Sequence, residues 1–227
     1  MIRGGTGRLR FGDLSRPRIL RRTQNSYIRY FCPLEFSPDN LAAQTPVRGL
    51  MCFPFILPSN TRFDRLAYFT STLSATTFFK IGFYTTSHDF ISPWPGRLIW
   101  EEPSWIQLNA VPAGLWTDGD FNPPIFLPGN ELLWYAFGCY DASTPGGSLY
   151  AIQAYTSGAA FATTAVPNIF GYSNPYDPFI GPPTSNCVYV YDGRTTTFSF
   201  PDPFPTDTFG ITYRNIPLFG ARLVSGI

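Results

Sequence analysis

The only histidine of the 227-residue chain, His88, stands in the turn-like sequence Ser-His-Asp-Phe at residues 87–90. A histidine can act as the general base for a serine nucleophile when an aspartate orients its ring. However, the chain has no Gly-x-Ser-x-Gly elbow ahead of a helix, the turn that exposes such a serine in many hydrolases. Because a lone histidine in a loop is far more often simply solvated, we assign His88 no catalytic role.

Cysteine and glycine motifs give no indication of a metal or cofactor site. The four cysteines are widely separated and never form a Cys-x-x-Cys pair: Cys32, Cys52, Cys139 and Cys187. Zinc sites and redox pairs need cysteine or histidine at close spacing. The chain also lacks the Gly-x-x-x-x-Gly-Lys loop and a Gly-x-Gly-x-x-Gly that follows a strand, so nucleotide binding has no support. We expect buried free thiols, no metal and no cofactor.

Two carboxylate pairs have the residue types that a glycosidase or a calcium loop requires. Glu101 and Glu102 are adjacent, so in an extended strand they face opposite ways and do not converge on one sugar. Asp118 and Asp120 flank Gly119, but a full calcium loop repeats its acidic residues at more positions. A solvated turn is the better interpretation. We therefore predict a protein that is not an enzyme.

The chain has five tryptophans, enough for a carbohydrate-binding module: Trp94, Trp100, Trp105, Trp116 and Trp134. Trp100 and Trp134 lie in apolar, strand-like sequence, where core packing is the commoner role. Trp94, within a Ser-Pro-Trp-Pro-Gly turn, is the tryptophan that we expect to be exposed. Residues 157–186 read as one long loop, either a recognition surface or a cover over an open end of the domain. The candidate receptor or glycan contacts are Trp94, Tyr172, Tyr176 and Phe179.

These residues must be positioned by a β domain, because aromatic and β-branched runs alternate with proline and glycine turns and helix signals are scarce. About ten short strands are predicted from Gly49 onward. They fall at 49–57, 63–71, 76–85, 97–100, 104–109, 114–118, 130–140, 148–155, 187–193, 209–213 and 217–224. Segment 87–96 is predicted to be rich in turns.

Alternation assigns faces to the early strands. Residues 49–57 include Pro54, which predicts an edge strand. In 63–71, the odd-numbered residues Phe63 to Phe69 are predicted to face one side and the even-numbered residues the other. In 76–85, one face holds Phe79, Ile81 and Phe83, and the other holds Phe78, Lys80, Gly82 and Tyr84.

Membrane insertion and secretion have no support in the sequence. The longest apolar run, 49–57, is too short to span a bilayer. The N-terminus is dotted with arginine and lacks the apolar core of a signal peptide. We expect no membrane span, and a chain that is soluble when made and folds in a reducing compartment.

The first 30 residues hold eight of the 16 basic residues and one acid, which gives them a formal charge of +7 against −6 for the remainder. The arginines are Arg3, Arg8, Arg10, Arg16, Arg18, Arg21, Arg22 and Arg29. Such an arm suits binding to nucleic acid phosphates. Because its charges alternate with apolar residues such as Leu9, Phe11 and Ile19, we favour an arm that binds a protein surface, with nucleic acid as the lesser alternative.

Five motifs follow in order from Gly49 to the C-terminus: FPFILPSNTRFDRLAYFTS, FFKIGFYTT, PWPGRLIWE, IFLPGNELLWYAF and RNIPLFGARLV. In this order they resemble a β-sandwich module of tailed-phage virion proteins, which occurs at tail-fibre tips and in short appendage or head-decoration proteins. The matching positions are Ile81, Gly82, Tyr84, Pro95, Gly96, Leu98, Pro128, Gly129, Trp134 and Ala136. The resemblance implies structural roles for these residues and carries over no catalytic or ligand residue.

Together these features predict an all-β protein, with an antiparallel, jelly-roll-like β-sandwich over 36–227 and an extended basic N-terminal arm over 1–35. The resemblance implies a non-enzymatic virion protein, made in the host cytoplasm and trimeric. The arm is expected to anchor it to other virion proteins, while the sandwich faces outward, with a host surface glycan as a candidate partner. The alternatives are a small-virus coat with a genome-binding arm and a carbohydrate-binding module. The sequence does not separate a tail appendage from a head decoration.

Overall fold

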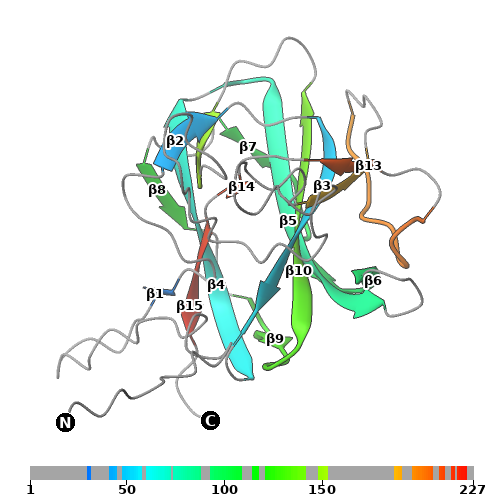
Figure 1. Cartoon of the computed structure of the whole chain (residues 1–227). Helices are drawn as coiled ribbons and strands as arrows, with labels where there is room; N and C mark the ends of the chain where they lie inside the picture. The colour runs from blue at the N-terminus through cyan, green and yellow to red at the C-terminus, as the bar shows by residue number, and fades with distance from the viewer. Residues whose placement is uncertain are drawn as a thin grey trace, which may run out of the picture.

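The computed structural model describes residues 30–31, 41–44, 48–57, 60–72, 74–87, 93–108, 114–117, 121–141, 148–152, 187–190, 196–206, 210–212, 216–217 and 219–223. Most of these residues lie in β-strands, and none of them forms an α-helix (Figure 1). Every strand pairing among them is antiparallel. The predicted all-β, antiparallel class is confirmed. Residues 1–29 and 157–186 lie outside the described residues.

The first sheet has eight strands in the order β1-β15-β4-β11-β14, with β2 beside β11 and with β8 and β9 beside β4. Its strands are β1 (Tyr30–Phe31), β2 (Leu41–Gln44), β4 (Thr61–Thr72), β8 (Gly114–Thr117), β9 (Ile125–Leu127), β11 (Ser148–Ile152), β14 (Ile216–Pro217) and β15 (Phe219–Leu223). β4 organises this sheet, because β15 and β11 pair along one of its sides and β8 and β9 along the other.

The second sheet has seven strands in the order β13-β12-β3-β10-β5-β6, with β7 beside β5. Its strands are β3 (Gly49–Ile56), β5 (Thr77–Ser87), β6 (Trp94–Glu101), β7 (Ile106–Gln107), β10 (Leu132–Asp141), β12 (Cys187–Val190) and β13 (Gly210–Thr212). Pro54 lies in β3 beyond Leu50–Cys52, the stretch that pairs with β12. β3 lies between β12 and β10, so the predicted edge strand is wrong. Pro54 is tolerated because its part of β3 pairs with β10 alone among the described strands.

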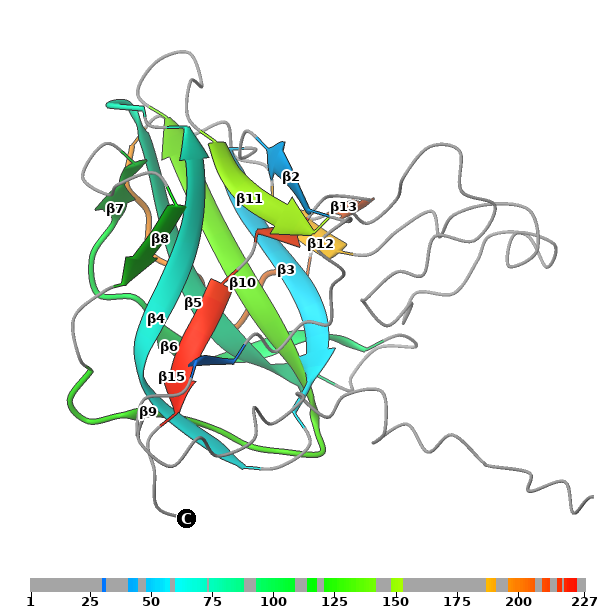
Figure 2. The same ribbon diagram turned by 90° about the vertical axis from the view of Figure 1, so that its left-hand side faces the viewer.

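The two sheets face each other across an apolar core (Figure 2). Phe63 and Phe219 of the eight-stranded sheet are fully buried and contact Phe83 of β5, with ring centroids 5.6 Å and 5.8 Å apart. Tyr135 of β10 lies 4.4 Å from Phe219 by the same measure. Phe79, Ile81 and Phe83 all belong to this core, which confirms the predicted inner face of β5.

The predicted alternation of β4 is wrong at Asp64. Phe63 and Leu66 are both buried, although they are an odd number of residues apart. The register against β15 shifts here, because Arg222 pairs with Arg65 while Leu223 pairs with Phe63. This β-bulge inserts one extra residue into β4, so the side chains after it change face. A single alternation rule therefore fails across the bulge.

The outer face of the seven-stranded sheet is buried as well, under residues 198–204, which we call the strap. Phe198, Phe200 and Phe204 of the strap pack with Tyr84 and Trp134 in a second apolar cluster. The sequence did not indicate this cover, since "FSFPDPF" has neither a helix nor a strand pattern. Burial of both faces explains why β10 is apolar or aromatic along almost its whole length, and why residues 78–84 of β5 are apolar apart from Lys80.

Glycines on two neighbouring strands make the slot that receives the strap. A Cβ added to Gly138 of β10 would lie 2.5 Å from Cε1 of Phe200, and one added to Gly82 of β5 would lie 2.9 Å from Cδ2. Two hydrogen bonds hold the strap after this ring: the Tyr84 hydroxyl donates to the Pro201 carbonyl, and the Phe204 N–H donates to the Gly96 carbonyl. The strap is therefore a docked element of the fold.

Candidate functional site

A groove of about 600 Å³ opens between the end of β6 and the segment that leads into β9. Its lining is mostly aromatic and proline: Ile99, Trp100, Glu101, Pro103, Phe121, Asn122, Pro123, Pro124, Ile125 and Phe126. Ligand pockets in proteins typically have volumes of about 300–1,000 Å³ and apolar linings with a few polar groups. Its size and lining make the groove the candidate functional site.

Backbone pairing holds both walls of the groove in place. The Glu102 N–H donates to the Ile81 carbonyl, which continues the attachment of β6 to β5. On the other wall, the Phe121 N–H donates to the Asp64 carbonyl, and Ile125 pairs with Phe63. The groove is thus set by the way its two walls attach to β5 and β4, one strand from each sheet.

Trp100 lines the groove and is half-buried. Its indole stacks on Phe83 of the core, with centroids 6.0 Å apart, and meets the edge of Phe121 at 5.1 Å. The predicted core role therefore describes one side of Trp100 only. Trp134 is fully buried, as predicted.

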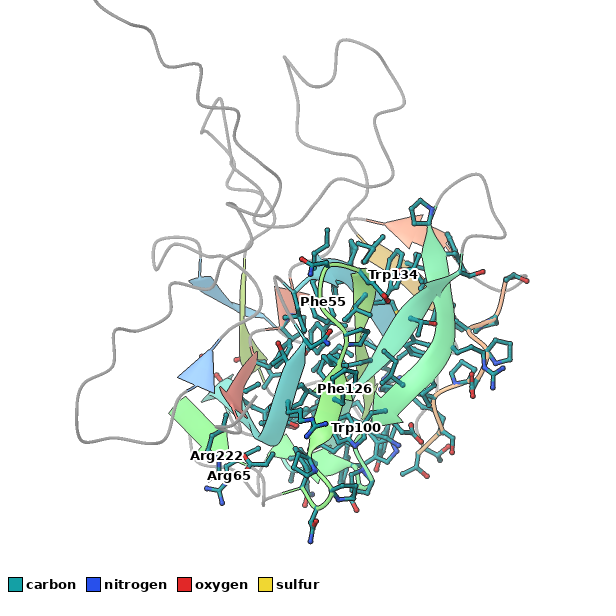
Figure 3. All side chains as sticks on the ribbon, turned by 90° about the horizontal axis from the view of Figure 1, so that it is seen from below. Phe55, Arg65, Trp100, Phe126, Trp134 and Arg222 are labelled. Carbon is teal, nitrogen blue, oxygen red and sulfur yellow. The ribbon has the colours of Figure 1, made fainter. Side chains whose placement is uncertain are left out.

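Phe126 stands on the rim of the groove with 44% of its surface exposed, and it is the only large apolar side chain exposed among the described residues. It lies beside Trp100 in the view from below (Figure 3). The guanidinium carbon of Arg62 lies 5.9 Å from the centre of its ring, a cation–π arrangement. This rim already accepts an arginine on an aromatic face.

Glu101 connects the groove to the strap. Its carboxylate lies 2.8 Å from Nζ of Lys80 and accepts the N–H of Phe200. Lys80 is the only lysine in the chain and is buried, with its ammonium 5.3 Å from the Phe200 ring centre and 5.7 Å from that of Trp105. The pair is thus held by aromatic contacts and by a backbone hydrogen bond, and the charge of Glu101 is compensated by Lys80.

Glu102 points the other way, as predicted for adjacent residues of an extended strand. It is buried, and its Oε1 accepts the hydroxyl of Tyr68 at 2.7 Å. The two glutamates therefore serve different faces of the sheet, and they do not converge on one substrate. The described geometry offers no glycosidase-type carboxylate pair at these positions.

Another ion pair lies beside the β4 bulge, at the same end of the molecule (Figure 3). Nε and Nη2 of Arg222 donate to the two carboxylate oxygens of Asp64, at 2.6 Å and 2.7 Å. These hydrogen bonds lower the pKa of Asp64 from its usual value. The bidentate pair ties β15 to β4 where the register changes.

The expected exposure of Trp94 is wrong, because only 4% of its surface is accessible. The last three residues of the segment predicted to be rich in turns, 94–96, are part of β6, with Trp94 opposite Ser87 and Pro95 opposite Thr86 of β5. Pairing turns the indole into the cluster under the strap, where it cannot act as a sugar platform. Its proline neighbours are tolerated because β6 is the last strand in the order of its sheet.

The other predicted site residues lie outside the described residues. These are the eight arginines Arg3, Arg8, Arg10, Arg16, Arg18, Arg21, Arg22 and Arg29, the loop aromatics Tyr172, Tyr176 and Phe179, and also His88, Asp118 and Asp120. Sequence reasoning in turn missed the groove. Its one available signal was the density of proline and aromatic residues in "DFNPPIF".

The predicted buried free thiols are confirmed for Cys52, Cys139 and Cys187, whereas Cys32 lies outside the described residues. Burial raises the pKa of Cys139 to about 12 and also raises that of Cys52. These thiols are therefore protonated at neutral pH. Over the described part of the chain, no three metal-ligating side chains gather into a site, and no helix is long and apolar enough to cross a membrane.

The chain matches no family model and no curated protein.

Proposed function

We propose that this chain is a non-enzymatic structural protein of a tailed-phage particle, an appendage or decoration. Residues 1–35 anchor it to other virion proteins, and its jelly-roll-like sandwich is presented outward, with three copies assembled together. It is made in the host cytoplasm and carried in the virion. A surface glycan of the host is a candidate partner of the outward part.

The arrangement of the resemblance motifs is the observation that supports this proposal. Three of the five motifs fall on β5, β6 and β10, which are neighbours in one sheet. The glycines at the matching positions have structural reasons: Gly82 leaves room for Phe200, and a Cβ on Gly96 would lie 3.0 Å from the Ser87 nitrogen. Trp134 is core and donates from Nε1 to Thr86. The motifs on β5, β6 and β10 are separate in the sequence, but their residues pack together in one sheet.

Of the two alternatives, the carbohydrate-binding module is weakened by the position of Trp94. Its proposed platform is buried in β6, and the remaining platform residues lie outside the described residues. The small-virus coat predicts a different behaviour of the arm, namely strong and salt-sensitive binding to nucleic acid. The experiment below separates these functions.

The test replaces Arg18, Arg21 and Arg22 with alanine in the genome that encodes the chain. The amount of the protein in purified particles is then measured by immunoblot. We expect a fall of about ten-fold or more, which corresponds to a loss of about 1.4 kcal/mol of binding free energy. Arg97→Ala is the matched control, because Arg97 is exposed on the sandwich and pairs only with the strap residue Asp202 in the described contacts.

Full occupancy of the particles by the triple variant would contradict anchoring by the arm. Loss of packaged genome with normal protein content would instead favour the coat alternative. Light scattering on the size-separated full chain tests the three-copy assembly, and a monomer at all concentrations would contradict it.

A further inference from the structure

The groove has the chemistry of a site for apolar and arginine side chains. Eight of its ten lining residues are apolar, one is the amide Asn122, and one is Glu101, whose carboxylate is engaged by Lys80 and the Phe200 N–H. None of the ten is basic. Because the groove lining has so few hydrogen-bonding groups, it suits a peptide with apolar side chains better than a hydroxyl-rich sugar. The polar groups of a sugar would lose water there without gaining partners, which is costly.

The groove lies at the end of the sandwich where the N-terminal segment joins it. Tyr30 and Phe31 pair with Arg222 and Ala221 of β15 as strand β1. Figures 1 and 2 show β1, the lower part of β15 and β9 at the same end of the molecule. The 29 residues that precede β1 therefore start close to the groove and can span roughly 95 Å when extended, at about 3.3 Å per residue.

The composition of residues 1–29 complements the groove. Arginines alternate there with Leu9, Phe11, Leu14, Ile19 and Leu20, so one extended stretch supplies both apolar anchors and guanidinium groups. The site offers matching surfaces: the Trp100 indole that lines the groove, and the exposed ring of Phe126, which already has the Arg62 guanidinium 5.9 Å from its centre. Arginine stacks well on aromatic rings, and none of the residues that line the groove is basic.

A second copy is the better source of this segment than the same copy. β1 joins the sheet through β15 on one side of β4, whereas β9 pairs on the opposite side. Each copy therefore presents the start of its arm on one side of β4 and its groove on the other, which suits a head-to-tail contact in which the arm of one copy meets the groove of the next.

We propose that the groove formed by Trp100, Phe121, Pro123, Pro124 and Phe126 binds residues 1–29 of a second copy of this chain. This inference rests on the proposed function, in that it names a receptor for the anchoring arm. In such an assembly the copies exchange arms, and the arm of each copy binds the groove of the next.

The test is photo-crosslinking from the rim of the groove in the full chain. Unlabelled protein carrying Phe126→p-benzoylphenylalanine is mixed at low concentration with ¹⁵N-labelled wild-type protein, concentrated, illuminated and digested. Mass spectrometry then identifies the peptides joined to residue 126. The matched control is Ser199→p-benzoylphenylalanine, since Ser199 is exposed on the strap and is not one of the residues that line the groove.

We expect ¹⁵N-labelled peptides from residues 1–29 joined to residue 126, and few or none joined to residue 199. Unlabelled arm peptides alone would mean that each copy binds its own arm, and would overturn the inference. Products without any arm peptide would overturn it too. If the triple arginine variant is lost from the particles but residue 126 captures no arm peptide, this inference fails and the proposed function stands. If residue 126 captures ¹⁵N-labelled arm peptides but the triple variant fully occupies the particles, the proposed function fails and this inference stands.

Discussion

The strap-covered face and the groove are two aromatic surfaces that both include residues of β6, and they differ in what covers them. On the covered face, Phe200 of the strap fills a slot above Gly82 and Gly138. In the groove, Trp100 and Phe126 border an open volume of about 600 Å³. The strap covers the first surface, whereas no segment among the described residues covers the groove.

Glu101 shows how close the two surfaces are. Its carboxylate accepts the strap's Phe200 N–H and pairs with Lys80, yet the residue also lines the groove. The strap supplies backbone hydrogen bonds and an aromatic plug, which together bury a lysine. The aromatic face beside β6 is thus covered by an aromatic segment of the same chain, and the groove offers a similar aromatic surface to another segment.

The largest expected effect comes from removing the plug. Phe200→Ala should destabilise the fold by about 3–5 kcal/mol, because a buried aromatic ring is replaced by a void above two glycines. Urea unfolding of the full chain, followed by tryptophan fluorescence, measures the change. Ser199→Ala, an exposed neighbour in the same strap, should stay within about 0.5 kcal/mol of wild type. Equal stability of Phe200→Ala and wild type would show that the strap is not docked as described.

A smaller effect is expected from filling the slot from below. In Gly138→Ala, the new Cβ would lie 2.5 Å from Cε1 of Phe200, so the strap must shift. Overpacking of this kind costs about 1–3 kcal/mol, measured by the same urea titration. Adding Phe200→Leu to this variant should restore space, so the double variant should lose less than the sum of the two single changes. Strict additivity would argue against direct contact between the two positions.

The smallest effect on stability is expected at the groove rim. Phe126→Thr keeps a residue suited to a strand and removes an exposed ring, so the fold should lose less than about 1 kcal/mol, mostly the cation–π contact with Arg62. By contrast, arm exchange should weaken, which light scattering on the full chain would show as dissociation at a higher concentration. A loss of stability as large as that of Phe200→Ala would mean that the rim is part of the core.

The local residue pattern predicted strands and their faces correctly where one alternation rule holds along the whole strand. The alternation in 76–85 separated the two faces of β5 correctly, and the predicted runs at 114–118, 187–193 and 209–213 contain β8, β12 and β13. It failed at Asp64, where a bulge changes the phase, and at Trp94, where two prolines and a glycine indicated a turn. Both errors arise because the partner strand, β15 or β5, decides the outcome, and the partner is not adjacent in sequence.

The sequence by itself determined the all-β class, the opposite directions of Glu101 and Glu102, and the absence of close-spaced cysteine motifs, since these depend on residue type and short-range geometry. Only the tertiary structure decided that both faces of the seven-stranded sheet are buried, that the single lysine sits under the strap, and that a groove opens beside β9. These features join residues about 20 to 120 positions apart, and their energy comes from contacts that local patterns do not encode. The groove therefore depends on packing between segments that are far apart in the sequence.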